Sequence, residues 1–421
     1  MTIYDTLNAQ QKKGVFTTEG PVLILAGAGS GKTRVLTHRV AYLLEECGVN
    51  PYHILAITFT NKAAGEMRER IDNMVGFGSE SIWVSTFHST CVRILRRYID
   101  RLGYDTNFTI YDADDQKTVM KDICKRLEID TKIHKEKTFL SVISSAKDEL
   151  IDPIEFETRA VGDYNKRRQA EVYKEYQRVL RQNNALDFDD IIYVTVKLLM
   201  EHEDVRQYYQ RKFRYVLVDE YQDTNHMQYL LTSLLAGGYE NICVVGDDDQ
   251  SIYRFRGATI ENILNFEKQY RGSRTIRLEQ NYRSTQSILN AANAVISHNL
   301  GRKGKRLWTS NGQGEPVTVY EAMDENGEGS YVAGRILSNK AKNIPLNAHA
   351  ILYRTNAQSR AMQLALAKNG IAYRVFGGMK FFDHAEVKDM LAYLQVINNR
   401  ADTLRLPDHQ QSSQRTWAQN H

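Results

Sequence analysis

The sequence predicts an α/β fold in which helices cover parallel β-sheets, and two observations carry this prediction. Short apolar runs typical of buried strands alternate with charged segments of helical periodicity along most of the chain. One of these runs passes through a glycine-rich loop directly into a helical stretch. The strand-like runs are residues 22–25, 54–58, 215–218, 242–245, 275–278, 317–320 and 350–353.

Length and composition narrow the class of protein. The chain has 421 residues, enough for two or three domains. Lys plus Arg number 55 and Asp plus Glu 51, so the net charge of +4 does not by itself indicate a nucleic-acid partner. We expect no membrane span, because the chain has no run of 18 apolar residues. We also expect no signal peptide, because the start of the chain lacks a basic segment followed by an apolar one. The four cysteines form no CxxC pair, which favours a reducing cytoplasm over a disulfide or metal framework.

Three segments interrupt or follow the alternation. From about residue 112 to 182 the chain is rich in charged residues with helical spacing, which predicts a helical insertion within one α/β domain. A second α/β unit is expected from about residue 279, with a turn at 311–316. The segment 399–421 is polar and without periodicity, and we expect it to be disordered.

The glycine-rich loop has the composition and context of a phosphate-binding loop. It lies between a predicted strand and a predicted helix, as that function requires. Its glycines allow backbone N–H groups to close around an anion, Lys32 would reach the β- and γ-phosphates, and Thr33 would help to hold Mg²⁺. The first position departs from the strict motif, which has Gly there. The loop reads Ala26-Gly27-Ala28-Gly29-Ser30-Gly31-Lys32-Thr33.

A second apolar run ends in two carboxylates, Asp219 and Glu220. The carboxyl end of a parallel strand is where α/β folds bind ligands. Asp219 suits Mg²⁺, and Glu220 suits orientation or deprotonation of the attacking water. An acidic pair after a strand can equally cap a helix, but together with the phosphate loop it favours a nucleoside triphosphatase.

The run at 242–245 is followed by Asp247, Asp248, Asp249 and Gln250. Gln250 is neutral and suits the sensing of a γ-phosphate. The aspartates could coordinate a metal, but a solvated acidic turn is the simpler interpretation for two of them. Aromatic and basic side chains alternate over 251–257, which fits either stacking on single-stranded nucleic acid or a core stripe with surface arginines.

In order and spacing, these segments resemble the superfamily 1 DNA helicases of the UvrD/Rep/PcrA type over roughly residues 3–398. Further motifs that carry the resemblance are Leu7-Asn8-Ala9-Gln10-Gln11, Ile57-Thr58-Phe59-Thr60-Asn61-Lys62-Ala63-Ala64, Val84-Ser85-Thr86-Phe87-His88-Ser89, Asp219-Glu220-Tyr221-Gln222-Asp223 and Leu278-Glu279-Gln280-Asn281-Tyr282-Arg283-Ser284. The resemblance implies ATP and Mg²⁺ as cofactors, and single-stranded DNA and tailed duplex DNA as partners.

The resemblance also implies roles for individual residues. Asp219, Glu220, Lys32, Gln250 and Arg283 would be catalytic, and Thr33 and Asp219 would hold the metal. ATP would be bound by Gln11 as adenine reader, residues 26–33, Arg34, Tyr282 as stacking partner of adenine, and Arg283. Gln222 would couple nucleotide to DNA. The DNA-binding residues would be Phe59, Thr60, Asn61, Thr86, His88, Tyr253, Phe255 and Arg256, with Phe255 standing where many relatives carry Trp.

For the domains, the resemblance implies a UvrD-like ATP-binding domain at residues 1–284. Its RecA-like core would be 1–110 and 186–284, with a helical insertion at 111–185 from which Asp187-Phe188-Asp189-Asp190 returns. Residues 285–398 would be the first part of a second RecA-like domain, and 399–421 a tail unrelated to the family. Two later family motifs, one supplying a second arginine to the γ-phosphate, are not found, so we expect a shortened form. Loss of such an arginine slows hydrolysis by about 10³–10⁵.

The expected function is that of an ATP-dependent 3′–5′ DNA helicase or translocase acting in DNA repair or replication restart. Two alternatives remain open at this point. The chain could be an ATP-gated module that binds single-stranded DNA without unwinding duplexes, or a product that folds stably only in its first domain. An incomplete second sheet predicts exposed apolar surface.

Overall fold

The fold was derived from a computed structural model, which describes residues 2–76, 79–254, 257–299, 301–376 and 385–404. The chain divides into two compact units, residues 1–315 with 389–421 and residues 316–388. No helix among the described residues is long and apolar enough to cross a bilayer.

The first unit is built on a parallel sheet, and the part of the chain that the structure describes contributes six strands to it in the order β3-β2-β6-β7-β1-β8. Five of them correspond to runs predicted from sequence. The sixth, β3, carries the polar residue Ser85 and gave no strand signal. The strands are β1 (Val22–Ala26), β2 (Ile54–Thr58), β3 (Trp83–Thr86), β6 (Tyr215–Val218), β7 (Ile242–Gly246) and β8 (Arg274–Leu278).

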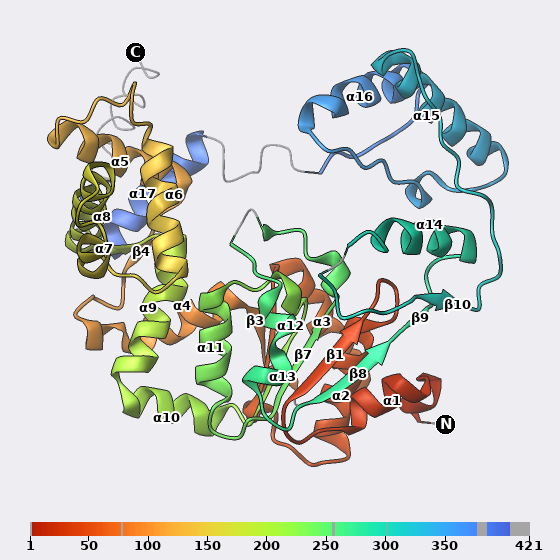
Figure 1. Cartoon of the computed structure of the whole chain (residues 1–421), viewed down its shortest axis with the longest axis horizontal. Helices are drawn as coiled ribbons and strands as arrows, with labels where there is room; N and C mark the ends of the chain where they lie inside the picture. The colour runs from red at the N-terminus through yellow and green to blue at the C-terminus, as the bar shows by residue number, and fades with distance from the viewer. Residues whose placement is uncertain (1, 77–78, 255–256, 300, 377–384, 405–421) are drawn as a thin grey trace. The chain divides into compact units, whose positions relative to one another are not determined.

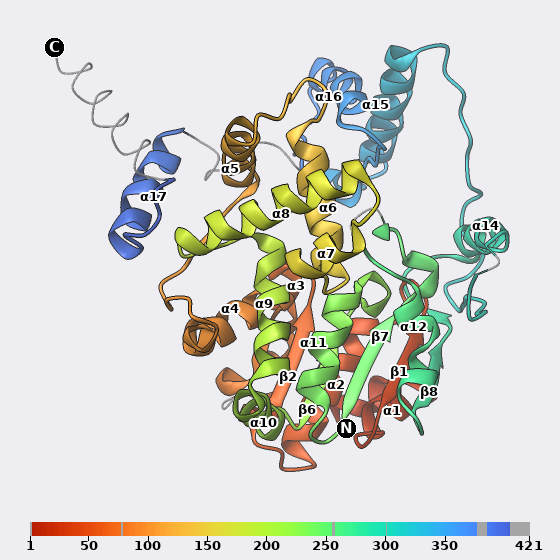
Figure 2. The ribbon, with the colours of Figure 1, turned by 60° about the vertical axis from the view of Figure 1, so that its left-hand side comes forward.

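Both faces of the sheet are buried at its central strands β2, β6, β7 and β1, which explains why these four are continuous apolar runs. The edge strands β3 and β8 carry polar residues and are only partly buried. Along β1, Leu23 and Leu25 pack into one core, whereas Val22, Ile24 and Ala26 pack into the other, as the twofold repeat of a strand dictates. The first core includes α4 (Phe87–Tyr98), α9 (Phe188–Glu201), α10 (Glu203–Lys212), α11 (His226–Ala236), α12 (Glu261–Leu264) and α13 (Phe266–Gln269). The second includes α1 (Ala9–Phe16), α2 (Lys32–Glu45) and α3 (Asn61–Val75). Figure 2 shows α9 and α11 in front of the sheet.

The helical insertion has a hydrophobic core of its own and a short parallel pair of strands at its base. Figure 1 shows its helices grouped apart from the main sheet. Asp112 begins the first helix by accepting hydrogen bonds from the N–H groups of Asp114 and Asp115. Its elements are β4 (Thr109–Ile110), α5 (Ala113–Arg126), α6 (Glu136–Asp148), α7 (Pro153–Arg159), α8 (Tyr164–Gln182) and β5 (Ala185–Leu186). The structure therefore places the exit and return of the insertion at 109–110 and 185–186.

A buried ion cluster joins the insertion to the core helix α9. The Lys147 ammonium on α6 lies 2.7 Å from Asp187 Oδ2 and 2.8 Å from Asp190 Oδ1, and all three side chains are buried. Tyr176 on α8 donates to Asp187 Oδ2 at 3.1 Å. Burial disfavours the charged form of Lys147, but the two carboxylates outweigh this and raise its pKa. The cluster therefore fixes α6 and α8 against α9.

Residues after β8 remain part of the first unit as far as Glu315, which differs from the domain boundary predicted at 284/285. The two-residue strands β9 (Gln280–Asn281) and β10 (Trp308–Thr309) pair in parallel beside the phosphate loop, with α14 (Gln286–Ile296) between them in sequence. Among the residues that the structure describes, the 3₁₀ helices are η1 (Ile3–Thr6), η2 (Pro51–His53), η3 (Ser79–Ser81), η4 (Ile99–Leu102), η5 (Tyr221–Asp223), η6 (Asp248–Gln250), η8 (Leu346–Ala348) and η9 (Asn356–Gln358).

The described part of the second unit is helical, and two strand predictions within it are wrong. Helices α15 (Glu325–Ala341) and α16 (Ser359–Lys368) pack on a small core. Residues 317–320 and 350–353 are not strands, and Val319 and Leu352 are 92% and 93% exposed. A parallel strand exists only when a neighbouring strand satisfies its backbone, and no described residue pairs with either segment. Most of their apolar side chains are accordingly exposed, although Ile351 is partly buried against the small core.

The segment predicted as a disordered tail begins with ordered residues. Helix α17 (Ala385–Asn398) leads to Asn399, whose buried side-chain amide lies within 3.0 Å of the carbonyl oxygens of Asn183 and Asn184. Tyr111 then donates to Asp402 Oδ1 at 2.6 Å. Residues 399–404 therefore pack on the insertion, so the prediction of disorder is wrong for them, while residues 405–421 lie outside the described residues.

We predict that Lys147→Met destabilises the first unit strongly, because two aspartates would remain buried without a counter-charge. Removing one partner of a buried ion pair costs about 3–5 kcal/mol. Urea denaturation followed by circular dichroism measures this loss. Lys174→Met is the matched control, since Lys174 on α8 pairs with Glu157 at 3.4 Å where both side chains are more than half exposed. Equal stability of the two variants would contradict the prediction.

Candidate active site

The phosphate loop links β1 to α2 at the carboxyl edge of the sheet. Gly29 and Gly31 have φ angles of 65° and 89°, in the left-handed region that favours glycine. Ser30 is buried, and its hydroxyl donates to the Gly27 carbonyl at 2.7 Å. From α1, Gln11 donates to the Ser30 carbonyl at 2.9 Å and is 1% exposed. Gln11, the residue predicted to read adenine, therefore holds the phosphate loop through this hydrogen bond.

The acidic pair at the end of β6 faces the start of α2. Lys32 Nζ lies 2.7 Å from Glu220 Oε2, and the Thr33 hydroxyl donates to Asp219 Oδ2 at 3.3 Å. Burial and the neighbouring Glu220 raise the pKa of Asp219 to about 6, against the effect of Lys32. A hydroxyl and a carboxylate oxygen are ligands that Mg²⁺ accepts. The residues predicted to hold the metal therefore lie together.

Hydrogen bonds continue from Glu220 to the end of β7. Gln222 donates to Glu220 Oε2 at 2.9 Å, and its Oε1 accepts the backbone N–H of Asp247 at 2.9 Å. The Gln250 amide donates to Asp247 Oδ2 at 2.5 Å. Asp247 thus joins Gln222, which was predicted to couple nucleotide to DNA, to Gln250, which was predicted to sense the γ-phosphate.

The segment after β8 runs along the phosphate loop. The Tyr282 backbone N–H donates to the Gly29 carbonyl at 2.9 Å, and its hydroxyl contacts Asn8 and Gln280. Arg283 follows next to the loop, because its Cβ would lie 2.9 Å from a side chain at Gly29. The structure therefore brings both residues of this motif to the predicted nucleotide site.

Arg34, the remaining predicted ATP ligand, lies one turn into α2 from this loop. Its guanidinium donates to the Thr6 hydroxyl at 2.6 Å.

Asn281 is a site residue that the sequence analysis did not single out. Its amide donates to the Ala28 carbonyl at 2.6 Å, and its carbonyl oxygen accepts the N–H groups of Arg283 and Ser284. It thereby joins the phosphate loop to the Tyr282–Arg283 turn. Its place directly before two predicted ligands, Tyr282 and Arg283, was the only available signal.

The acidic turn after β7 is not solvated, which corrects the simpler of the two interpretations. Asp247 and Asp248 are buried. Lys305 Nζ lies 2.7 Å from Asp247 Oδ1 and 2.9 Å from Asp249 Oδ2, and also contacts Asp248. Carboxylate oxygens of the three aspartates lie within 4.8 Å of one another, close enough for a metal. The lysine ammonium stands at that position and supplies the positive charge.

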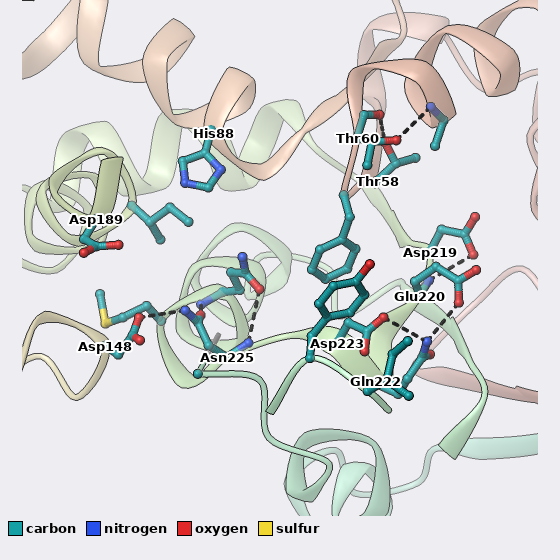
Figure 3. A pocket seen from close by; sticks show the side chains of 18 of the residues that line it. Thr58, Thr60, His88, Asp148, Asp189, Asp219, Glu220, Gln222, Asp223 and Asn225 are labelled. Carbon is teal, nitrogen blue, oxygen red and sulfur yellow. Dashed lines mark hydrogen bonds between the residues drawn. The ribbon is translucent and has the colours of Figure 1, made fainter. Parts of the chain in front are cut away.

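Nucleotide-site and predicted DNA-binding residues meet in one cavity of about 960 Å³. In Figure 3, Asp219, Glu220, Gln222 and Asp223 lie on one side, and His88, Asp148 and Asp189 on the other. Four predicted DNA-binding residues line the cavity, namely Phe59, Thr60, His88 and Tyr253.

The other predicted DNA-binding residues lie elsewhere or are not described. Thr86 is buried and caps α4 by accepting the Ser89 N–H at 3.1 Å, and Asn61 is exposed at the start of α3. Phe255 and Arg256 lie outside the described residues. Phe188, which sequence reasoning treated only as part of the return from the insertion, is half exposed and lies 5.1 Å from the His88 ring.

Helix α6 of the insertion forms one wall of this cavity, and its Asp148 lies near Asp189 of α9. Burial, with repulsion from Asp189 and Glu149, raises the pKa of Asp148 to about 7. Asn225 on α11 donates to Asp148 Oδ1 at 2.7 Å. Burial lowers the pKa of His88, so its ring is neutral at pH 7. The wall's negative charge therefore depends on pH in the neutral range.

Comparisons with known proteins were made for the whole chain. The profile of the UvrD/REP helicase N-terminal domain matches residues 7–271, and that of the UvrD-like helicase C-terminal domain matches residues 276–420. The chain is 54% identical over 400 residues to proteins named ATP-dependent DNA helicase PcrA from Staphylococcus epidermidis and Staphylococcus aureus. The alignment covers 95% of this chain and 55% of each relative, so the chain spans about half their length. The second match runs through most of the segment 399–421, whose independence of the family stays a prediction.

We predict that Asp148→Asn stabilises the protein more at pH 8 than at pH 5. A carboxyl whose pKa is raised in the folded state destabilises that state as pH rises from its unfolded value of 3.8 toward about 7. Asparagine keeps the acceptor for Asn225 without the charge. Thermal melting should show a rise of about 2–4 °C at pH 8, which corresponds to ~1 kcal/mol. A rise of the same size at both pH values would show that the charge of Asp148 is not the cause.

Proposed function

Because the chain belongs to the UvrD/REP helicase family, we propose that it binds ATP with Mg²⁺ at the phosphate loop and uses it to act on single-stranded DNA. We further propose 3′–5′ movement along the strand and the separation of tailed duplexes, in DNA repair or replication restart. The observation that supports this function best is the shared cavity, in which Thr33 and Asp219 lie near Phe59 and Tyr253. A nucleotide-dependent change at one group of residues can thereby reach the other.

The proposed roles follow from the contacts. The N–H groups of the loop and Lys32 bind the phosphates, and Thr33 with Asp219 holds Mg²⁺. When Lys32 turns toward the β- and γ-phosphates it leaves Glu220, whose carboxylate then orients the attacking water. Gln250 and Arg283 face the γ-phosphate.

Stacking and backbone contacts are the proposed mode of DNA binding. Tyr253 and Phe59 provide aromatic faces for bases, and Thr60 provides a hydroxyl for a phosphate. Base stacking tolerates any sequence, so we propose binding without sequence specificity. A DNA substrate and free thiols at all four cysteines favour the cytoplasm as location.

An ATP-gated module that binds single-stranded DNA without unwinding it is the second candidate. The exposed apolar segments at 317–320 and 350–353 favour it, because a second domain without these strands lacks a firm surface for cleft closure. Strand separation on a 3′-tailed duplex distinguishes the two candidates. Separation that Lys32→Ala abolishes would exclude the second.

We predict that Lys32→Ala lowers ATP turnover by at least about 10²-fold, as loss of one charge-stabilising donor does elsewhere. Turnover is measured with and without single-stranded DNA. Lys13→Ala is the control, because Lys13 is exposed on α1. Turnover that persists in Lys32→Ala would refute the assignment of the phosphate loop. ATP binding without turnover in the unaltered chain would favour the second candidate.

We predict that Tyr253→Ala weakens binding of an oligo(dT) strand about 10-fold, since stacking on one aromatic ring contributes ~1–3 kcal/mol. Fluorescence anisotropy at fixed salt concentration measures this affinity. Tyr239→Ala provides the control, because Tyr239 precedes β7 at the opposite end of that strand and is similarly exposed. Equal affinities for the two variants would remove Tyr253 from the DNA site.

A further inference from the structure

We propose that Lys305 is a positioning residue of the nucleotide site, which holds Asp247 so that Gln250 faces the γ-phosphate and Gln222 supports Glu220. This inference rests on the proposed function and extends it to a residue outside the motifs described above. Lys305 lies far along the chain from the strand that it supports, since it and Asp248 are 57 residues apart.

Lys305 is held by three carboxylates in a site closed to solvent. Its side chain is 1% exposed, and those of Asp247 and Asp248 are 2% and 0% exposed. Burial lowers the pKa of Lys305, but the aspartates outweigh this and raise it, so the lysine is charged. Arg302 adds a second cation at 2.8 Å from Asp249. Without Lys305, Asp247 and Asp248 would repel each other at the end of β7.

The carboxylate of Asp247 links Lys305 to Gln250, the glutamine proposed to sense the γ-phosphate. Asp247 Oδ1 accepts from Lys305 at 2.7 Å, and Oδ2 of the same group accepts from Gln250 at 2.5 Å. The Asp247 backbone N–H donates to Gln222, which in turn donates to Glu220. Displacement of Asp247 would therefore move both glutamines and loosen the support of the catalytic carboxylate.

The segment that carries Lys305 also contacts the nucleotide side directly. A side chain at Gly27 would place its Cβ only 2.0 Å from Leu307 Cδ2, so Leu307 packs closely on the phosphate loop. The Trp308 N–H donates to the Glu279 carbonyl at 3.1 Å, and β10 pairs with β9 beside Tyr282. Lys305 thus fastens the Tyr282–Arg283 side of the site to the Gln250 side.

The simpler account is that Lys305 only neutralises buried charge and supports the fold. The two accounts differ in what happens to discrimination between nucleotides. A positioning residue affects recognition of the γ-phosphate more than recognition of ADP. A merely structural residue lowers stability and leaves the ratio of the two affinities unchanged.

The test is to measure the dissociation constants of ADP and of AMP-PNP, a non-hydrolysable ATP analogue, with Mg²⁺ by competition against a fluorescent nucleotide. We expect the unaltered chain to prefer AMP-PNP and Lys305→Met to reduce the preference about 10-fold, with ADP affinity changed less than about twofold; this loss corresponds to one hydrogen bond to a charged group. Lys303→Met is the matched control, because the Lys303 side chain pairs with the half-exposed Glu267 at 3.0 Å. It should keep the preference.

Asp247→Asn provides a second variant of nearly the same volume. Its single amide oxygen cannot replace both carboxylate oxygens of Asp247, which accept from Lys305 and from Gln250, so one of the two bonds is lost. It should reproduce the loss seen in Lys305→Met, and the double variant should lose no more than either single one. If Lys305→Met fails to fold, the preference of Asp247→Asn for AMP-PNP over ADP tests the positioning role.

The outcomes separate this inference from the proposed function. A retained preference for AMP-PNP in Asp247→Asn, or in a folded Lys305→Met, would overturn the positioning role. Absence of any preference in the unaltered chain would overturn it as well. Failure of the chain to bind nucleotide, or equal binding by Lys32→Ala, would overturn the proposed function itself and with it the role of Lys305.

Discussion

The ion pair between Lys32 and Glu220 joins the end of β6 to the start of α2, and the arrangement of the site depends on it. Parallel strands end at the same edge of their sheet, so the charges of several segments accumulate there and each needs a counter-charge. Glu220 balances Lys32, and Lys305 balances the aspartates after β7. Gln222, which is neutral, spans the space between the two charged groups. The edge is thus a connected polar network with a cation at either end.

The shape of the shared cavity depends on a second buried cluster. Helix α6 contributes Ser141, Ser144 and Asp148 to the cavity wall, and Lys147 lies on the same helix. Because the Lys147 ammonium is held by Asp187 and Asp190 on α9, the wall has a fixed position relative to the sheet. The insertion is therefore part of the site, although its sequence suggests only a charged helical segment.

Features that depend only on residues close together in the chain could be predicted from the sequence. The four central strands of the main sheet are apolar runs because both sheet faces are buried there, and the phosphate loop is contiguous in the chain. The segments 317–320 and 350–353 have the same apolar character, but strand formation also needs a partner backbone, which the run itself does not encode. Lys305 was missed for a related reason. A lysine among other basic residues reads as a solvated run, and only the fold brings it to the acidic turn.

The backbone conformation of Glu220 explains how the carboxylates of Asp219 and Glu220 reach two consecutive residues, Thr33 and Lys32. In an extended strand Asp219 and Glu220 would point to opposite faces. Glu220 instead has a φ of 50°, in the left-handed region, and the chain turns at once into η5. Both side chains thereby reach the start of α2, Asp219 at Thr33 and Glu220 at Lys32. Such a conformation costs about 1–3 kcal/mol, and the ion pair with Lys32 and the hydrogen bond from Gln222 offset it. Because these contacts hold Glu220 in the strained conformation, a nucleotide that draws Lys32 away removes one of them. The remaining bond, from Gln222, is the one that Asp247 and Lys305 support.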